Sequence, residues 1–138
     1  MSDYPGYLDA YQSGKLKKIA DELFLSLKSC QICPRRCRVN RLEEKLGFCK
    51  TGSLPKIFSF MDHHGEEPPI SGSRGSGTIF FSHCNMGCVY CQNYEFSQLG
   101  KGRIYTLEEL AQIMLKLQNQ GCHNINLVTP THVFTPNT

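Results

Sequence analysis

The sequence predicts an α/β fold in which an irregular, helical, cysteine-rich N-terminal lobe precedes a single strand–helix–strand unit. Two apolar runs, over residues 78–82 and 125–128, flank an amphipathic segment that begins at Thr106. Strand, helix and strand in that order form a βαβ unit, which implies a parallel sheet with a right-handed crossover. We place the lobe and its glycine-rich linker at residues 1–76 and the βαβ domain at residues 77–138.

The composition is that of an ordinary globular protein. The chain has 138 residues, 40% of them hydrophobic and 20% charged, which is enough for one domain with a core. A net charge of +3 is too small to imply binding to nucleic acid or to an anionic membrane. We find neither a signal peptide nor an apolar run near the ~18 residues of a membrane span. Eight cysteines then indicate a reducing compartment, the cytoplasm, where clustered cysteines more often bind metals than form disulfides.

The first predicted element is an amphipathic helix from Lys15 to Ser29, preceded by a break at Ser13 and Gly14. Apolar residues recur in it at spacings of three and four, which predicts a packing face. These residues are Leu16, Ile19, Ala20, Leu23, Phe24 and Leu27. The helix carries no group that suggests chemistry.

Four cysteines follow this helix within a short segment: Cys30, Cys33, Cys37 and Cys49. Four thiolates can bind zinc in a closed tetrahedral site, and they can equally bind an iron–sulfur cluster. Zinc would serve to fold the lobe, whereas a second cluster would transfer electrons. The spacing leaves both metals open, beside the alternative of buried free thiols.

A short strand is predicted at Lys56–Phe60, and residues 61–69 have the composition of a loop. The next strand, over residues 78–82, is continuously apolar, as expected of a strand that is buried on both faces. It leads directly into Cys84, Cys88 and Cys91. Three thiolates can hold three irons of a four-iron, four-sulfur (4Fe-4S) cluster, which normally takes four cysteines. The fourth iron then stays open for chemistry.

Thr106 and Glu109 form a predicted capping box at the start of the next helix, and Gly121 stands at its expected end. The predicted apolar face consists of Leu107, Leu110, Ala111, Met114 and Leu117. The second strand of the unit ends in residues 129–132. Functional groups collect at the carboxyl ends of parallel strands, so this segment and the three-cysteine loop should be neighbours. Cys122 stands alone and is interpreted as a small buried residue.

The motifs together resemble radical S-adenosylmethionine (SAM) enzymes, and in particular the poorly characterised branch related to pyruvate formate-lyase activating enzymes. The signature Cys84-x3-Cys88-x2-Cys91 lies at the end of what would be the first barrel strand. The other motifs are Cys30-x2-Cys33-Pro-Arg-x-Cys37-x-Val-Asn-Arg41, Gly65-Glu-Glu-Pro-x-Ile-Ser-Gly72, Gly75-Ser-Gly-Thr-Ile-Phe-Phe-Ser82, Cys91-Gln-Asn93 and Asn124-Ile-Asn-Leu-Val-Thr-Pro-Thr-His132. The resemblance extends from about Tyr7 to His132.

This resemblance implies a 4Fe-4S cluster whose open iron takes the amino and carboxylate groups of SAM. Reductive cleavage of SAM would yield a 5′-deoxyadenosyl radical that abstracts hydrogen, in the activating enzymes from a glycine of a partner protein. It also implies an electron donor such as flavodoxin or ferredoxin. Tyr90 resembles the residue that packs near the adenine, with ordinary packing as the alternative, and Asn93 falls in the same cofactor-binding segment.

The sequence departs from the family pattern in two respects. The Gly-Gly-Glu motif that receives the methionine amino group is absent from the second strand, where the hydroxyls of Thr129 or Thr131 could take its role. A full β/α barrel also needs roughly 200–250 residues, so the chain is expected to be its truncated N-terminal portion and to be poorly active alone. The alternative function is a non-catalytic iron–sulfur or zinc module, or an inactive fragment.

Overall fold

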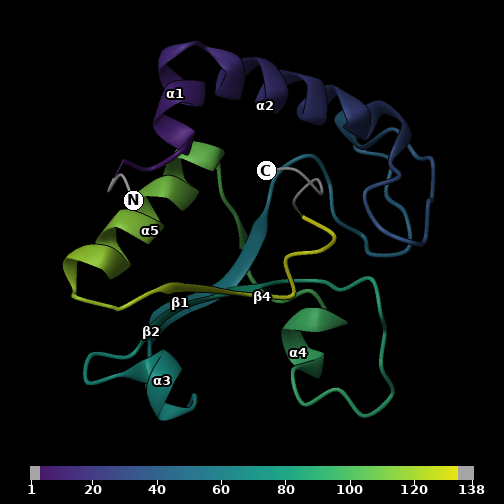
Figure 1. The fold of residues 1–138 in the computed structure, drawn as a ribbon. Coiled ribbons are helices and arrows are strands. Elements are labelled where there is room, and N and C mark those ends of the chain that lie inside the picture. The colour runs from purple at the N-terminus through teal and green to yellow at the C-terminus, as the bar shows by residue number, and fades with distance from the viewer. Residues whose placement is uncertain (1–3, 134–138) are drawn as a thin grey trace.

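The computed structural model describes residues 4–133, and within that range four strands form one mixed sheet in the order β3-β1-β2-β4. The strands are β1 (Lys56–His63), β2 (Ser76–Phe81), β3 (Arg103–Ile104) and β4 (Ile125–Val128). The helices are α1 (Tyr7–Gln12), α2 (Lys15–Leu25), α3 (Pro68–Ser71), α4 (Tyr94–Ser97) and α5 (Leu107–Asn119), with 3-10 turns η1 (Ser26–Ser29) and η2 (Arg41–Glu43). Figure 1 shows α1 and α2 arching over the side of the sheet on which α5 lies.

The predicted βαβ unit is confirmed as β2, α5 and β4. Strands β2 and β4 pair in parallel, from Gly77 opposite Ile125 to Phe80 opposite Val128. The capping box is also confirmed. The Thr106 hydroxyl oxygen accepts from the backbone N–H of Glu109 at 3.1 Å, and the Glu109 carboxylate accepts from the N–H of Thr106 at 2.8 Å. These two bonds satisfy amides that the first turn of a helix otherwise leaves without partners.

Strand β1 is longer than predicted, and its pairing changes the type of sheet. It continues from the predicted segment to His63, and α3 occupies residues 68–71, so residues 61–69 are not one continuous loop. The physical reason is that β1 pairs antiparallel with β2 as far as His63 opposite Ser76. Backbone pairing to a buried neighbour overrides the polar composition of this end. The sheet is therefore mixed rather than purely parallel, and it spans the expected division at residue 76.

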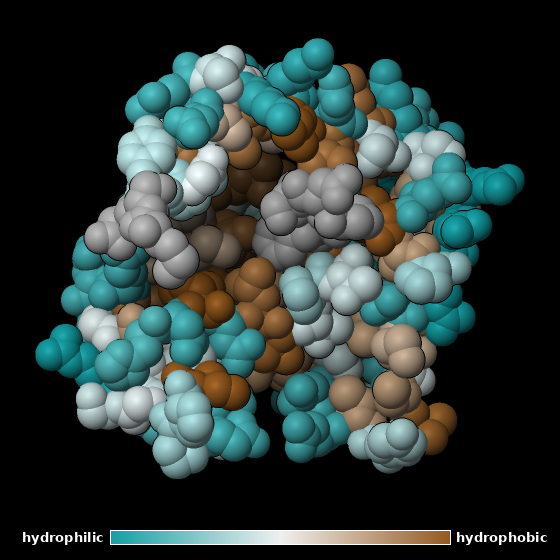
Figure 2. All heavy atoms as spheres, viewed as in Figure 1, coloured by the Kyte–Doolittle hydropathy of each residue, from teal (hydrophilic) through white to brown (hydrophobic). Residues whose placement is uncertain are grey.

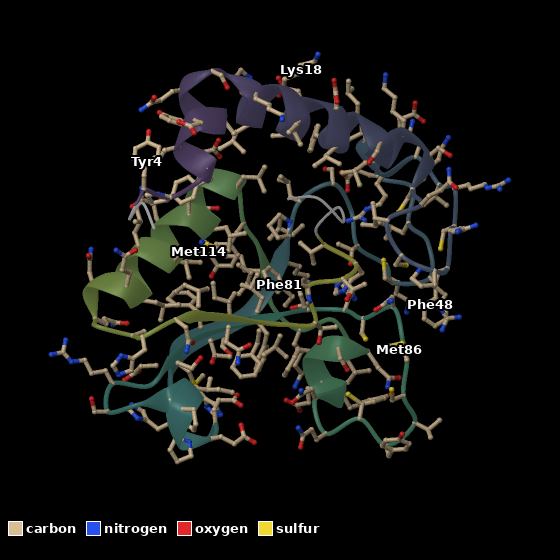
Figure 3. The ribbon with its side chains drawn as sticks, viewed as in Figure 1. Tyr4, Lys18, Phe48, Phe81, Met86 and Met114 are labelled. Atoms are coloured by element: carbon tan, nitrogen blue, oxygen red, sulfur yellow. The ribbon has the colours of Figure 1, made fainter. Side chains whose placement is uncertain are left out.

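The main core lies between the sheet and α5. Its buried members are Ile57, Ile79, Phe81, Leu110, Ile113 and Leu117, with Met114 packed against them. Figure 3 shows Phe81 of the sheet beneath Met114 of α5. Burial of each large apolar side chain contributes about 1.5–3 kcal/mol. The buried stripe of α5 is rotated from the predicted one, because Ile113 belongs to it while Leu107 is 51% exposed and Ala111 is exposed.

Helix α2 begins at Lys15 as predicted but ends at Leu25, and the last four residues of the predicted helix form the 3-10 turn η1. Of the predicted apolar face, only Leu27 in η1 is buried. No residue of α2 is buried, and Leu16 and Phe24 remain 39% and 42% exposed. Figure 2 shows apolar surface lining a hollow between the arch of helices and the sheet. A second, smaller core of Leu27, Cys30 and Ile32 joins the end of this arch to the cysteine-rich lobe. Within the described residues, no helix is both long enough and apolar enough to cross a lipid bilayer.

Candidate functional site

The loop between β2 and α4 carries the three cysteines of the predicted cluster signature. Cys84, Cys88 and Cys91 are all half-buried, and the loop begins directly after the carboxyl end of β2, as predicted. Strand β4 lies beside β2 in parallel, so its carboxyl end reaches the same edge of the sheet. The predicted placement of the loop and of residues 129–132 at one sheet edge is therefore confirmed.

Polar groups contact two of the three sulfur atoms. The backbone N–H of Met86 donates to Sγ of Cys84 at 3.3 Å, and Sγ of Cys91 lies 3.2 Å from the hydroxyl oxygen of Ser97. Cysteine binds metal through its sulfur atom, and these two sulfur atoms have polar neighbours. The donor set therefore fits an iron–sulfur cluster. However, no group of three or more His, Cys, Asp or Glu side chains within residues 4–133 stands as a ready-made metal site.

The backbone of this loop is held by Arg35, which comes from the N-terminal lobe. Its Nε donates to the carbonyl oxygen of Asn85 at 2.9 Å, and its Nη2 donates to that of Met86 at 3.2 Å. The same guanidinium stacks 3.6 Å from the ring centroid of Phe48. In Figure 3, Phe48 and Met86 lie on adjacent loops. Nothing in the spacing of the sequence indicated this contact, because Arg35 was only part of a motif.

The four cysteines of the lobe are brought together around one small cavity. Cys30, Cys33, Cys37 and Cys49 all line a cavity of about 10 Å³. Backbone hydrogen bonds between Cys30 and Val39, and between Cys30 and Arg38, close the chain into a hairpin around it. The sequence predicted these four residues as one set, and their convergence on one cavity is consistent with that grouping.

Arg41 also lines this cavity, and it is only 2% exposed. Its Nε donates to the carbonyl oxygen of Gly52 at 2.8 Å, and its Nη1 donates to that of His132 at 3.0 Å. Nη1 also lies 3.8 Å from Sγ of Cys30. None of the ion pairs found among the described residues includes Arg41. Nothing in the local sequence distinguishes this buried arginine from a solvent-exposed one.

His132 connects the same cavity to the end of β2. It is fully buried, and its Nε2 lies 3.0 Å from the carbonyl oxygen of Ser82. Burial is the main cause that lowers the pKa of His132 to about 4, and the nearby charge of Arg41 lowers it further. The hydrogen bond to Ser82 acts in the opposite direction. The imidazole is thus neutral near pH 7, with its proton on Nε2 facing that oxygen. Its Nδ1 is buried and lacks a hydrogen-bond partner.

The remaining predicted cofactor-binding residues surround the three-cysteine loop. Tyr90 is 89% exposed, so its ring is largely uncovered by the described residues. Asn93 is half-buried and makes no side-chain cap on α4. Thr129 is half-buried with a φ of 61°, an uncommon backbone conformation for a β-branched residue, whereas Thr131 is exposed. Cys122 packs partly buried against the main core.

Comparison with known proteins finds two similarities. Residues 78–136 match the family model of the radical SAM superfamily. An uncharacterized protein of Methanocaldococcus jannaschii is 36% identical over 118 residues, which cover 80% of this chain and 32% of the relative. The chain thus spans about a third of the length of this curated relative. No solved structure matches the chain.

Proposed function

We propose that this chain is the cluster-binding portion of a radical SAM enzyme. Cys84, Cys88 and Cys91 would hold three irons of a 4Fe-4S cluster through their thiolates. The match of residues 78–136 to the superfamily supports this proposal, and so does the donor set of the loop. The observation that carries it is the position of the three-cysteine loop at the carboxyl end of β2, directly beside the end of β4.

Each residue of the loop would have a limited task, because the cofactors supply the reaction itself. When bound, the cluster and SAM supply reductive cleavage of the sulfonium, and the resulting 5′-deoxyadenosyl radical abstracts hydrogen from a substrate. The three thiolates would leave the fourth iron open to the amino and carboxylate groups of SAM. A hydroxyl of Thr129 or Thr131 would accept a hydrogen bond from the amino group, and Tyr90 and Asn93 would contact the adenosine.

The conformations of two of these residues support such tasks. Thr129 holds a left-handed conformation at the end of β4, and strained backbone of this kind often occurs at functional sites. Tyr90 exposes 89% of its surface on the same loop as the cysteines, so its ring is available to stack on a ligand. Neither residue needs to move out of the core in order to act.

We extend the proposal to a substrate class on the sequence resemblance alone. The motifs resemble the branch related to pyruvate formate-lyase activating enzymes, so the hydrogen would come from a glycine of a partner protein. The electron would come from a small donor such as flavodoxin or ferredoxin. The partner protein and the electron donor would act on the whole enzyme. This chain spans about a third of the length of its curated relative.

The test is electron paramagnetic resonance of the chain after anaerobic reconstitution with iron and sulfide and reduction, with and without SAM. We expect a 4Fe-4S signal that shifts when SAM is added. The signal should disappear in Cys84→Ser and persist in Cys122→Ser, a matched control because Cys122 lies outside the signature. A signal that SAM does not alter would contradict the proposal and indicate a non-catalytic iron–sulfur module.

A further inference from the structure

We infer that Cys30, Cys33, Cys37 and Cys49 bind a single zinc ion, with the buried guanidinium of Arg41 as the charge partner of the site. This inference goes beyond the proposed function, because it uses none of the three cysteines of the cluster loop. Structural zinc sites in proteins are almost always tetrahedral, and four thiolates form one of their common ligand sets.

The backbone around the cavity is shaped as a ligand-bearing turn. The N–H of Arg36 donates to the carbonyl oxygen of Cys33, and the N–H of Lys50 donates to that of Gly47. Cys33 therefore begins one tight turn, and Cys49 lies within another. The N–H of Phe48 donates to Sγ of Cys37 at 3.5 Å. At Gly47, an added Cβ would come within 2.9 Å of that same sulfur, so a side chain there would crowd the ligand.

The cavity between the four cysteines is small. Its volume of about 10 Å³ is close to that of one water-sized sphere. One ion can enter this space if the four sulfur atoms close around it. A cube of four irons and four sulfides is larger than the space, so the lobe would have to open in order to hold it, and zinc is the metal that we propose.

The charge of Arg41 provides the second argument. A buried guanidinium is costly unless negative charge lies close to it, and within the described residues it is paired with no carboxylate. Its acceptors are the carbonyl oxygens of Gly52 and His132, and its Nη1 also lies 3.8 Å from Sγ of Cys30. Four neutral thiols would leave the positive charge uncompensated.

Zinc binding resolves this imbalance without a redox step. The four thiols release four protons and bind Zn²⁺ as thiolates, which gives the site a net charge of −2 next to the guanidinium. Because no described group of three or more ligands is ready-made for a metal, we expect the ion to draw the sulfur atoms inward from the cavity wall. The ion would thereby fix the lobe from which Arg35 reaches Asn85 and Met86.

The experiment measures the zinc content of the full chain after purification and exhaustive dialysis, before any reconstitution with iron. We expect one zinc per chain in the wild type, in Cys84→Ser and in Cys122→Ser, and a loss of at least tenfold in Cys37→Ser and Cys49→Ser. Replacement of zinc by cobalt(II) should give the thiolate charge-transfer and visible bands of a tetrahedral site. Titration of the wild type with a mercurial gives a measurement that does not depend on the folding of a variant. Of the eight thiols in the chain, the four outside the site should react without releasing zinc, and the remaining four should react as the zinc is released.

A matched pair of variants tests the role of the charge. Arg41→Met keeps four thiols and the bulk of the side chain, and we expect it to lose zinc to a chelator at least tenfold faster than the wild type. Arg36→Met removes an exposed guanidinium from the same turn and should retain zinc normally. Zinc that is absent from the wild type, or that depends on Cys84 rather than on Cys37, would overturn the inference. So would iron and sulfide bound at these four cysteines.

Discussion

Nε of Arg35 lies 2.9 Å from the carbonyl oxygen of Asn85, so a residue between two lobe cysteines positions the loop of the other three. The two groups of cysteines are far apart in the sequence and are proposed to bind different metal centres, yet one side chain connects the segments that carry them. This contact makes the conformation of the loop depend on the folding of the lobe.

Arg35→Ala should weaken the hold on the three-cysteine loop. It removes both donors to the loop, at Asn85 and Met86, together with the stacking on Phe48. Because the site is partly exposed, each hydrogen bond should contribute only about 0.5–1.5 kcal/mol to the free energy that fixes the loop, and the variant should lose that contribution. The measurement is the rate at which a reconstituted cluster loses iron to a chelator, which should rise severalfold. Arg36→Ala, next to it in the sequence and exposed, should leave that rate unchanged.

Gly87→Ala should disturb the same loop through its backbone. Gly87 has a φ of 70°, and an added Cβ would lie 3.3 Å from Cζ of Phe48. An L side chain in the left-handed conformation costs about 1–2 kcal/mol. We expect a lower midpoint of urea unfolding and a smaller iron content after reconstitution.

Gly6→Ala is the control for this substitution. Gly6 has a φ of −60°, and an added Cβ there would meet no atom within 4 Å. Its unfolding midpoint should equal or slightly exceed that of the wild type. Equal effects of the two substitutions would show that the conformation of Gly87 contributes nothing specific.

His132→Ala should separate the ends of β2 and β4. The substitution leaves the buried carbonyl oxygen of Ser82 without its partner and creates a cavity beside Arg41. An unsatisfied buried polar group costs about 1–3 kcal/mol. Chemical denaturation should show a loss of at least this size, while His64→Ala, at an exposed position, should change stability by less than about 0.5 kcal/mol. A neutral result for His132→Ala would mean that the bond to Ser82 is not maintained in solution.

Under the proposed function, the chain alone should cleave SAM much more slowly than a radical SAM enzyme with a complete barrel. Strand β4 stands at the edge of the sheet, and the apolar face of α2 is uncovered. Such surfaces are normally paired or buried in a complete fold. The measurement is the rate of 5′-deoxyadenosine formation by both proteins at equal cluster content. Comparable rates would contradict this expectation and would show that the described part of the chain suffices for the chemistry.

The sequence by itself determined the features that depend on neighbouring residues. The capping box of Thr106 and Glu109, the buried strand before Cys84 and the βαβ order all follow from local patterns, because capping and alternation act over a few residues. The grouping of the cysteines into three and four was also readable from spacing alone, although the occupation of both sites is a proposal.

Only the tertiary structure decided which distant groups meet. It paired β1 with β2 and so made the sheet mixed, and it buried Arg41 against the carbonyl oxygen of His132, which lies 91 residues away in the sequence. No local pattern encodes such pairs, because a charged side chain has the same sequence signature whether it is solvated or buried. Its partners are set by how the lobe packs on the sheet, where burial of apolar side chains dominates the free energy and polar groups take the acceptors that remain within reach.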